Sequence, residues 1–388
     1  MKVLFISNDP KIFIPGSTVR TRMRSYAEAI GELHIISRGS GESSVEGSLH
    51  LYPVQASRLF APSIITKRAK RIIATEGIEI VSAQDPFEFG RVALRATRGT
   101  SAKLHIQVHT DFLSPWFVRT GNMRMSLLNW HRRRIARSVL PKAAGIRVVS
   151  ERIKRSLLET YKNRIVEPTV LPIGVSLTGD IGTPNTPVPF HVFTFTLLAV
   201  SRLEPEKRIH DLLEAVAIAR VTYPFIGLII VGDGRLKHSL MRKAHALGLG
   251  DWVQFLGERA DIRLLMAHAQ SFIQASAYEG YGLTLVEAAL ARLPIITTDV
   301  GIIGDILLNE EDVRVVPVGQ PHELAEAIGV SIRNVDDRAR MVRSAEGKVL
   351  AHLTKFQGLS RHIANDLARL IPILDQEVED RSDKTPIG

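Results

Sequence analysis

The chain has 388 residues, which is enough for two ordinary domains that each bury a core of their own. Its composition is 45% hydrophobic and 23% charged, which is typical of a folded globular protein and excludes a disordered one. The net charge is +10, and the chain has no cysteine, which excludes disulfides, thiolate metal sites and cysteine nucleophiles.

The first half of the chain alternates short apolar runs with amphipathic stretches. We expect buried strands over Lys2–Ile6, Leu33–Ser37, Ile78–Ser82, Leu104–Val108 and Ile146–Val149, and helices over Thr18–Ile30 and Ile64–Thr75. Apolar strands that alternate with helices are typical of a parallel sheet with helices on both faces. Residues 1–175 are therefore predicted to form one doubly wound, Rossmann-like domain.

Residues 176–190 interrupt this alternation with three prolines and two glycines, which indicates a linker. The alternation then restarts, and residues 191–359 are predicted to form a second Rossmann-like domain. Its expected strands are Phe193–Val200, Phe225–Val231, Trp252–Leu256, Ser271–Ala275, Pro294–Thr298 and Val313–Val316, and its expected helices are Ile209–Arg220, Arg235–Leu247, Ile262–His268 and Leu283–Arg292. Helical patterns fill residues 321–369, and residues 376–388 form a charged tail.

Two such domains place the carboxyl ends of both sheets on either side of one cleft, where ligands of open α/β sheets bind. The first ten residues become polar too early for a signal peptide. No apolar run approaches the roughly 18 residues of a membrane span. We therefore expect a cytoplasmic protein that is soluble or peripheral to the membrane.

The segment 276–287, SAYEGYGLTLVE, joins a predicted strand to a predicted helix. Gly280 and Gly282 permit unusual backbone conformations and the close approach of a ligand. The amides at the start of the helix favour an anion such as a diphosphate. Glu287 lies about one turn into the helix, where its carboxylate can bind a ribose diol, and Glu279 is placed to reach a sugar beyond the diphosphate.

The loop after the first strand of the second domain, 201–208, reads SRLEPEKR. Arg202 and Lys207 can converge there on one diphosphate, the first as a fork and the second as a point charge. In contrast, the run Gly232-Asp233-Gly234 lacks the third glycine of a dinucleotide fingerprint and indicates a tight turn. The sequence contains no Asp-x-Asp pair to hold a divalent ion, so the basic residues would have to neutralise the leaving group.

Two features of the first domain point to the same cleft. Gly16 lies in a loop that precedes a predicted helix, as in a phosphate-approach loop. His109 directly follows the strand Leu104–Val108, where its ring can bind a sugar hydroxyl or a phosphate. Each also has a purely structural interpretation, as a turn glycine or as a histidine satisfied by backbone partners.

In order and spacing, four segments resemble glycosyltransferase family 4, the retaining GT-B glycosyltransferases. They are Ser201-Arg202…Glu206-Lys207, Val231-Gly232-Asp233-Gly234, Val253-x-Phe255-Leu256-Gly257 and Glu279-Gly280-Tyr281-Gly282…Glu287. The resemblance covers nearly the whole chain and is most specific over residues 197–300. One departure is that the usual Gly-Gly-x-x-Glu reads Gly301-Ile302-Ile303-Gly304-Asp305 here.

The resemblance implies a retaining, metal-independent hexosyltransferase with two Rossmann-like domains facing across a cleft, and a helix over residues 360–375 that returns to the first domain. Its substrates would be a UDP- or GDP-linked sugar and a glycan or lipid-linked acceptor of the cell envelope, with no cofactor. The implied catalytic residues are His109, Arg202, Lys207 and Glu279, and the implied donor-binding residues are Gly16, Ser201, Arg202, Lys207, Val253, Tyr281, Gly282, Leu283 and Glu287. A sugar-nucleotide 2-epimerase of the same fold and a non-catalytic partner subunit remain as alternatives.

The excess of basic residues lies in the first half, where residues 1–180 hold 28 Lys and Arg against 14 Asp and Glu. Such a half predicts a polyanionic partner: nucleic acid, an anionic membrane or a phosphorylated acceptor. Because a nucleic-acid binder would not explain the diphosphate motifs, we expect contact with an anionic membrane and no nucleic acid. Two basic stretches are candidates for this membrane contact. The first contains Lys67, Arg68, Lys70 and Arg71. The second contains Arg132, Arg133, Arg134 and Arg137, interleaved with the apolar residues Leu127, Leu128, Trp130, Ile135 and Val139.

Overall fold

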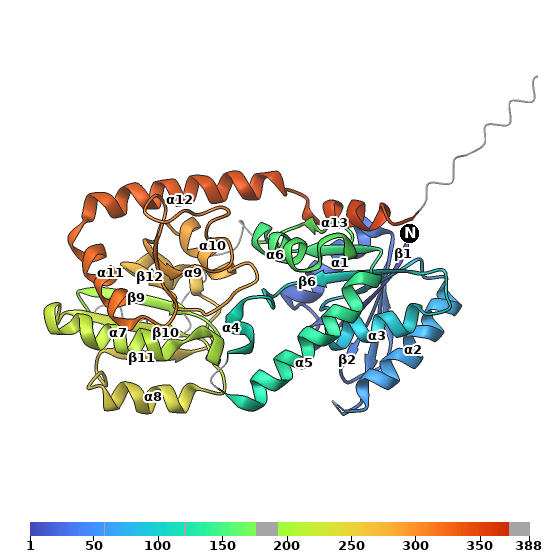
Figure 1. Ribbon diagram of the computed structural model, residues 1–388, viewed down its shortest axis with the longest axis horizontal. Coiled ribbons are helices and arrows are strands. Elements are labelled where there is room, and N and C mark those ends of the chain that lie inside the picture. Colours follow the sequence, from blue (N-terminus) through green and yellow to red (C-terminus); the bar gives the residue numbers. More distant parts are fainter. Residues whose placement is uncertain (58, 120–121, 176–192, 372–388) are drawn as a thin grey trace, which may run out of the picture.

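The computed structural model describes residues 1–57, 59–119, 122–175 and 193–371, and it has two α/β domains side by side (Figure 1). Each domain is built on its own sheet, and the strands within each sheet are almost all parallel. The predicted fold class is confirmed. The predicted linker, 176–190, and the predicted tail, 376–388, lie outside the described residues.

The first domain has an eight-stranded sheet in the order β3-β4-β2-β1-β5-β6-β7-β8. The strands are β1 (Lys2–Ser7), β2 (Glu32–Arg38), β3 (Ser44–Glu46), β4 (Leu49–Val54), β5 (Ile80–Ala83), β6 (Lys103–Val108), β7 (Gly145–Val148) and β8 (Thr169–Val170). Among the strands that the structure describes in this domain, only β3 runs antiparallel to its neighbour. Three of these strands were not predicted from the sequence. β3 and β8 are short edge strands of three and two residues. β4 is an inner strand of six residues, but His50, Tyr52 and Pro53 interrupt its apolar pattern.

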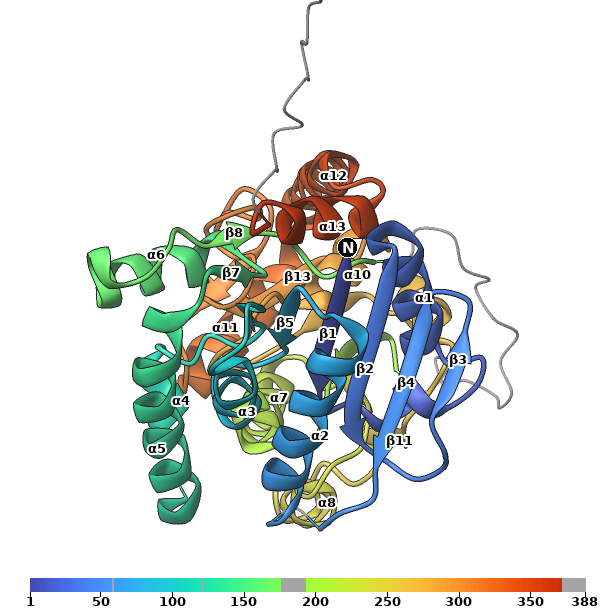
Figure 2. The same ribbon diagram turned by 90° about the vertical axis from the view of Figure 1, so that its right-hand side faces the viewer.

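Helices cover both faces of this sheet, as expected of a doubly wound domain (Figure 2). They are α1 (Thr18–Ile30), α2 (Ala61–Glu76), α3 (Glu88–Thr97), α4 (Pro115–Val118), α5 (Met123–Val139) and α6 (Glu151–Tyr161), with 3₁₀ turns at Pro10–Phe13, Leu140–Lys142 and Lys162–Arg164. The short helix α4 and the first turns of α5 project from the domain toward the second domain (Figure 1).

The second domain has a six-stranded sheet in the order β11-β10-β9-β12-β13-β14. Its strands are β9 (Phe195–Val200), β10 (Ile226–Val231), β11 (Val253–Gly257), β12 (Ser271–Ile273), β13 (Ile295–Thr298) and β14 (Arg314–Val316), and all of them are parallel. Its helices are α7 (Ile209–Thr222), α8 (Lys237–Ala246), α9 (Ile262–His268), α10 (Leu283–Leu290) and α11 (Pro321–Arg333), with a 3₁₀ turn at Pro205–Lys207. The strand order reverses between β9 and β12, which marks the switch point where ligands bind.

The helical tract after residue 320 consists of three helices. After α11, the long α12 (Val335–Lys355) runs along the top of the molecule from the second domain toward the first (Figure 1). The chain then turns at Gly358, whose φ is 68°, into α13 (Leu359–Ala368). This last helix packs on α1 and buries Ile363 and Leu367 in the same core as Met23 of α1.

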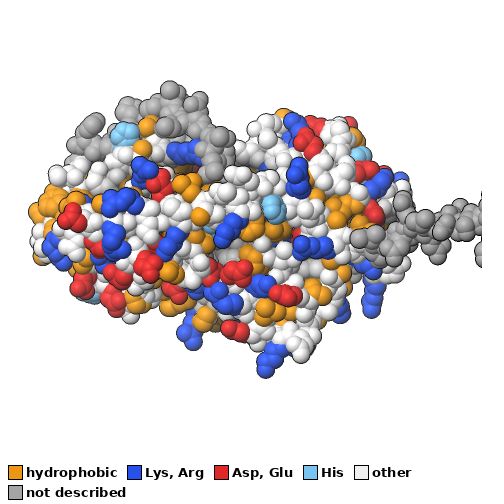
Figure 3. Space-filling model, turned by 90° about the horizontal axis from the view of Figure 1, so that it is seen from above, with side chains coloured by type: hydrophobic (Ala, Val, Ile, Leu, Met, Phe, Trp, Pro, Cys, Tyr) orange, Lys and Arg blue, Asp and Glu red, His pale blue; other side chains and the backbone are white. Residues whose placement is uncertain are grey.

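The upper face, over α12 and its neighbours, carries basic and acidic side chains in alternation (Figure 3). Many of them are paired, such as Lys348 with Glu311 and Arg340 with Asp337. Among the described residues, no helix combines the length and the apolar character that crossing a bilayer would require.

Candidate active site between the two domains

A cavity of about 1090 Å³ lies between the two domains, at the carboxyl ends of their strands. Three of its walls are loops that follow strands. His109 and Thr110 follow β6, residues 202–208 follow β9, and residues 277–280 follow β12. The parallel sheets therefore bring together segments that lie far apart in the sequence, as the position of the switch point predicts.

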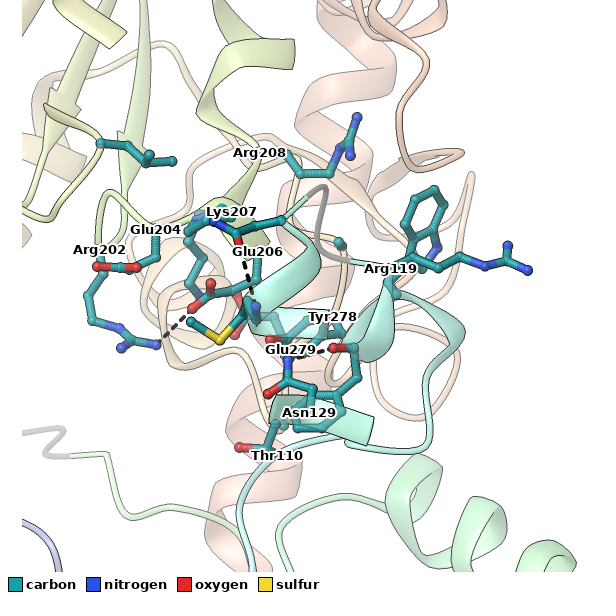
Figure 4. A pocket seen from close by; sticks show the side chains of 18 of the residues that line it. Thr110, Arg119, Asn129, Arg202, Glu204, Glu206, Lys207, Arg208, Tyr278 and Glu279 are labelled. Carbon is teal, nitrogen blue, oxygen red and sulfur yellow. Dashed lines mark hydrogen bonds and ion pairs between the residues drawn. The ribbon is translucent and has the colours of Figure 1, made fainter. Parts of the chain in front are cut away.

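Lys207 and Glu279 form an ion pair at the centre of this cavity (Figure 4). Both side chains are largely enclosed, at 13% and 15% exposed. The Ser276 hydroxyl also donates to the Glu279 carboxylate at 2.8 Å, and the Ala277 amide donates to the Glu206 carbonyl at 2.7 Å. These contacts hold the loop after β9 against the loop after β12, so that a fixed cation and a fixed carboxylate face one space.

Arg202 lies at the rim of the same cavity, where its side chain is 74% exposed (Figure 4). It pairs with Glu206 at 3.2 Å. Nearby, Arg235 pairs with Glu204 at 2.7 Å and also lines the cavity. Pairs this exposed contribute little to stability, because water screens them and the side chains stay mobile. Arg202 is therefore free to turn toward an anion in the cavity.

Gly280 joins the two domains by backbone contact. A Cβ atom at this position would lie 1.9 Å from the carbonyl oxygen of His109, a distance that real side chains do not reach. On its other side, the hydroxyl of Ser150, the residue that caps α6, donates to the Gly280 carbonyl at 2.9 Å. Glycine is required here because only a residue without a side chain lets the second domain approach His109 so closely.

A second contact between the domains lies on the side of α6. The Arg152 amide donates to the Asp305 carboxylate at 2.7 Å, and Arg155 pairs with the same carboxylate at 2.6 Å. The Arg152 guanidinium also binds Asp299 and donates to the Ile303 carbonyl. Asp305, the residue that departs from the family pattern, thus caps the first turn of a helix in the other domain.

His109 lines the cavity and is held by a chain of polar groups beneath it. Its Nε2 donates to the Gln107 side-chain oxygen at 2.9 Å, and the Gln107 amide donates to the Ser82 hydroxyl at 2.9 Å. The Ser82 hydroxyl also lies within hydrogen-bonding distance of Nδ1 of His105, at 2.8 Å. Burial, together with the positive charges of Arg147 and other neighbours, lowers the pKa of His109 to about 3. The ring is therefore neutral at physiological pH and cannot act as a proton donor of ordinary acidity.

Not all of the predicted site residues line the cavity. Those that do are His109, Arg202, Lys207 and Glu279. Four others lie next to the cavity: Ser201 in the loop after β9, Gly282 at the end of the loop after β12, and Leu283 and Glu287 in the first half of α10. Gly16 is an exposed residue with φ 73° before α1. Val253 and Tyr281 are buried in the cores. Burial raises the pKa of Glu287, while Arg263 acts in the opposite direction.

One wall of the cavity, contributed by α4 of the first domain, was not predicted from the sequence. Trp116 and Phe117 of α4 line the cavity, and they contact the second domain through Arg208, 5.6 Å from the Trp116 ring centre, and Tyr278, 5.5 Å from the Phe117 ring centre. The Asn129 side-chain amide holds α4 in place by donating to the Phe117 carbonyl at 2.6 Å. No local motif marks these residues, because their position depends on how α4 and α5 pack.

The chain is similar to known proteins in both domains. Residues 16–178 match the model of Glycosyltransferase Family 4, and residues 193–348 match the model of Glycosyl transferases group 1. The glycogen synthase of Mycobacterium tuberculosis is 33% identical over 115 residues, which are 29% of this chain and 28% of the relative. The alpha-monoglucosyldiacylglycerol synthase of Streptococcus pneumoniae is 28% identical over 242 residues, 59% of this chain and 54% of the relative.

The similarity in structure is more extensive than the similarity in sequence. HepE of Anabaena, solved in complex with UDP and glucose, has a TM-score of 0.68 and 20% sequence identity over 95% of this chain and 100% of that chain. The match to the glycogen synthase spans less than a third of that relative's length. The solved structure therefore establishes the fold, and the family models establish the relationship by sequence.

We predict that Gly280→Ala forces the domains apart. The added methyl group meets the His109 carbonyl, and overpacking of this kind costs about 1–3 kcal/mol. Thermal unfolding should show a Tm several degrees lower than that of the wild type, and small-angle scattering should show a larger radius of gyration.

Gly250→Ala is the matched control, because Gly250 is exposed and its added methyl group would meet no atom within 4 Å. If the two variants have the same Tm and the same radius of gyration, the contact between Gly280 and His109 does not hold the domains together.

Proposed function

We propose that the protein transfers a sugar from a nucleoside diphosphate sugar to an acceptor. The chain belongs to the GT-B glycosyltransferases, since its first domain matches Glycosyltransferase Family 4 and its second matches Glycosyl transferases group 1. The observation that carries this proposal is the enclosed pair of Lys207 and Glu279 in the cavity between the domains. A transferase of this kind needs a fixed cation for the leaving diphosphate and a fixed acceptor of hydrogen bonds for the sugar.

In the proposed reaction, the bond between the anomeric carbon and the diphosphate oxygen breaks, and a bond from the same carbon to the acceptor oxygen forms. Lys207 and Arg202 stabilise the negative charge that develops on the diphosphate. The departing phosphate oxygen takes the proton of the acceptor hydroxyl, and the anomeric configuration is retained. His109 acts as a neutral hydrogen-bonding group in this scheme, because its lowered pKa keeps the ring uncharged.

Two further details belong to the proposal. The first is that basic side chains replace a metal ion at the diphosphate, since the sequence has no Asp-x-Asp pair. The second is that the nucleotide is uridine or guanosine diphosphate, and HepE, solved with UDP, favours uridine. In this scheme Glu279 binds the transferred sugar and Glu287 the ribose.

We predict that Lys207→Ala lowers kcat/KM for the nucleotide sugar by a factor on the order of 100, because the developing charge loses its enclosed partner. Initial rates of sugar transfer, or of slow donor hydrolysis without acceptor, measure the effect.

Lys237→Ala is the matched control, since Lys237, the first residue of α8, pairs with Asp233 in the preceding loop and does not line the cavity. Wild-type rates in Lys207→Ala, or an equal loss in both variants, would contradict the assignment.

We further propose that the acceptor is lipid-linked and that the enzyme works on an anionic membrane. Two helices begin at the lower side of the molecule, α2 and α5 (Figures 1 and 2). Both beginnings expose large apolar side chains, which we call the basal patch: Leu59, Phe60 and Ile64 at α2, and Met123, Leu127 and Trp130 at α5. The relative from Streptococcus pneumoniae is by its name a synthase of a glucosyl lipid, which supports this choice of acceptor.

The basic residues near the basal patch divide into two groups. Arg68, Arg132 and Arg133 are engaged within the protein, with Arg133 donating to the carbonyls of Phe112 and Ser114. Exposed positions remain for Lys67, Lys70 and Arg71 on α2 and for Arg124, Arg134 and Arg137 on α5. Each basic residue near an anionic surface contributes about 1 kcal/mol, so the exposed ones and the apolar patch together can hold the protein there.

We predict that the protein sediments with vesicles of anionic phospholipid at low salt and less so at high salt, because salt screens the basic residues. The double substitution Leu127→Glu, Trp130→Glu should abolish sedimentation, since it places two carboxylates in the basal patch.

Val221→Glu is the control, because Val221 is an exposed apolar residue on α7 of the other domain, at 88% exposure. If the wild type stays in the supernatant at low salt, the membrane proposal fails and a soluble acceptor takes its place.

A further inference from the structure

Three metal-ligand side chains converge on the first sheet, away from the cavity. They are Glu32 and His34 of β2 and His50 of β4, and one ligand atom of each lies within 4.8 Å of the others. We propose that these three residues bind a divalent transition-metal ion of the zinc type. The proposal does not rest on the transferase function, and the site is separate from the active site.

The pairing of the strands sets the geometry of the three ligands. His34 and His50 lie directly opposite each other in the parallel register of β2 and β4. Glu32 precedes His34 by two residues and therefore projects from the same face of the sheet. The two imidazole rings are stacked, with centres 4.3 Å apart. The sheet thus holds two imidazoles and one carboxylate within reach of one ion, which both rings can bind once the partly exposed His50 ring turns out of the stack.

The surroundings of His34 are those of a metal ligand. Its side chain is fully buried, and both of its ring nitrogens have a polar partner. The Tyr52 hydroxyl lies 3.0 Å from Nδ1, and the Glu32 carboxylate lies 2.8 Å from Nε2. On metal binding, the ring proton moves to Nδ1 and is donated to the Tyr52 oxygen, while Nε2 binds the ion. A partner on the second nitrogen is what orients a histidine ligand.

The other two ligands leave a path for the ion. The side chains of His50 and Glu32 are 22% and 26% exposed, so the ion can enter from solvent and a water molecule can complete its coordination. Lys2 pairs with the second oxygen of Glu32 at 3.0 Å, and its charge opposes the ion, whereas Glu76 nearby favours it. Two nitrogens and one oxygen suit zinc, cobalt, nickel or copper rather than magnesium or calcium.

The position of the site indicates its role. Glu32 is the first residue of β2, whereas the cavity lies at the carboxyl ends of the strands. An ion at this end cannot reach the transferred sugar. It would instead cross-link β2 to β4 near the edge of the sheet and stabilise that edge, because binding to the folded state alone raises stability by mass action.

The test uses the full chain and zinc or cobalt salts alone. Zinc at a hundredfold excess over its Kd should raise the Tm of the wild type by about 5 °C or more, and cobalt should give the visible absorption of a protein-bound ion. His50→Ala and Glu32→Gln should each lose both responses, because each removes one ligand of the ion. Both side chains are partly exposed, so we expect these variants to fold. His322→Ala, which removes an exposed histidine of α11, should respond like the wild type.

The proposal is overturned if zinc leaves the Tm of the wild type unchanged and isothermal titration shows no heat of binding. It is also overturned if His50→Ala and Glu32→Gln respond to zinc as the wild type does, because the ion then binds elsewhere.

Discussion

Gly280 lies against the carbonyl of His109, and this contact fixes the distance between the two domains. The Ser150 hydroxyl bonds the Gly280 carbonyl from the first domain, and Glu279, one residue earlier, faces Lys207 in the cavity. A single short loop thus joins the domains and also presents the carboxylate of the site. The position of Glu279 relative to the first domain depends on a residue without a side chain next to it.

The charges of the cavity follow from the same arrangement. Lys207 and Glu279 neutralise each other in the absence of a ligand, so neither is left as an unpaired charge in an enclosed space. A diphosphate that binds Lys207 would replace the Glu279 carboxylate as its partner, and the diphosphate carries more negative charge than the carboxylate. Arg202 can join from the rim, because its own pair with Glu206 is exposed and weak. The charged side chains of the cavity are therefore paired when it is empty, and Lys207 and Arg202 can exchange these partners for a bound anion.

Local patterns in the sequence predicted the fold class and the part of the cavity formed by the second domain. The reason is that the loops after β9 and β12 are short and themselves contain residues that line the cavity, including Lys207 and Glu279. The first domain was less predictable, since Trp116 and Phe117 reach the cavity only through the packing of α4 on α5. A basic run such as residues 132–137 also looks uniform in sequence, although Arg133 binds backbone carbonyls within the protein.

The proposed reaction requires that the cavity bind a nucleoside diphosphate through Lys207. Isothermal titration of UDP and GDP into the wild type, Lys207→Ala and Lys237→Ala measures this binding. The account predicts saturable binding of one of the two nucleotides, weakened at least about tenfold by Lys207→Ala, since that change removes a charge-assisted bond worth roughly 1.5–3 kcal/mol, and unchanged in Lys237→Ala. Equal affinity in all three proteins, or no binding of either nucleotide to the wild type, would contradict it.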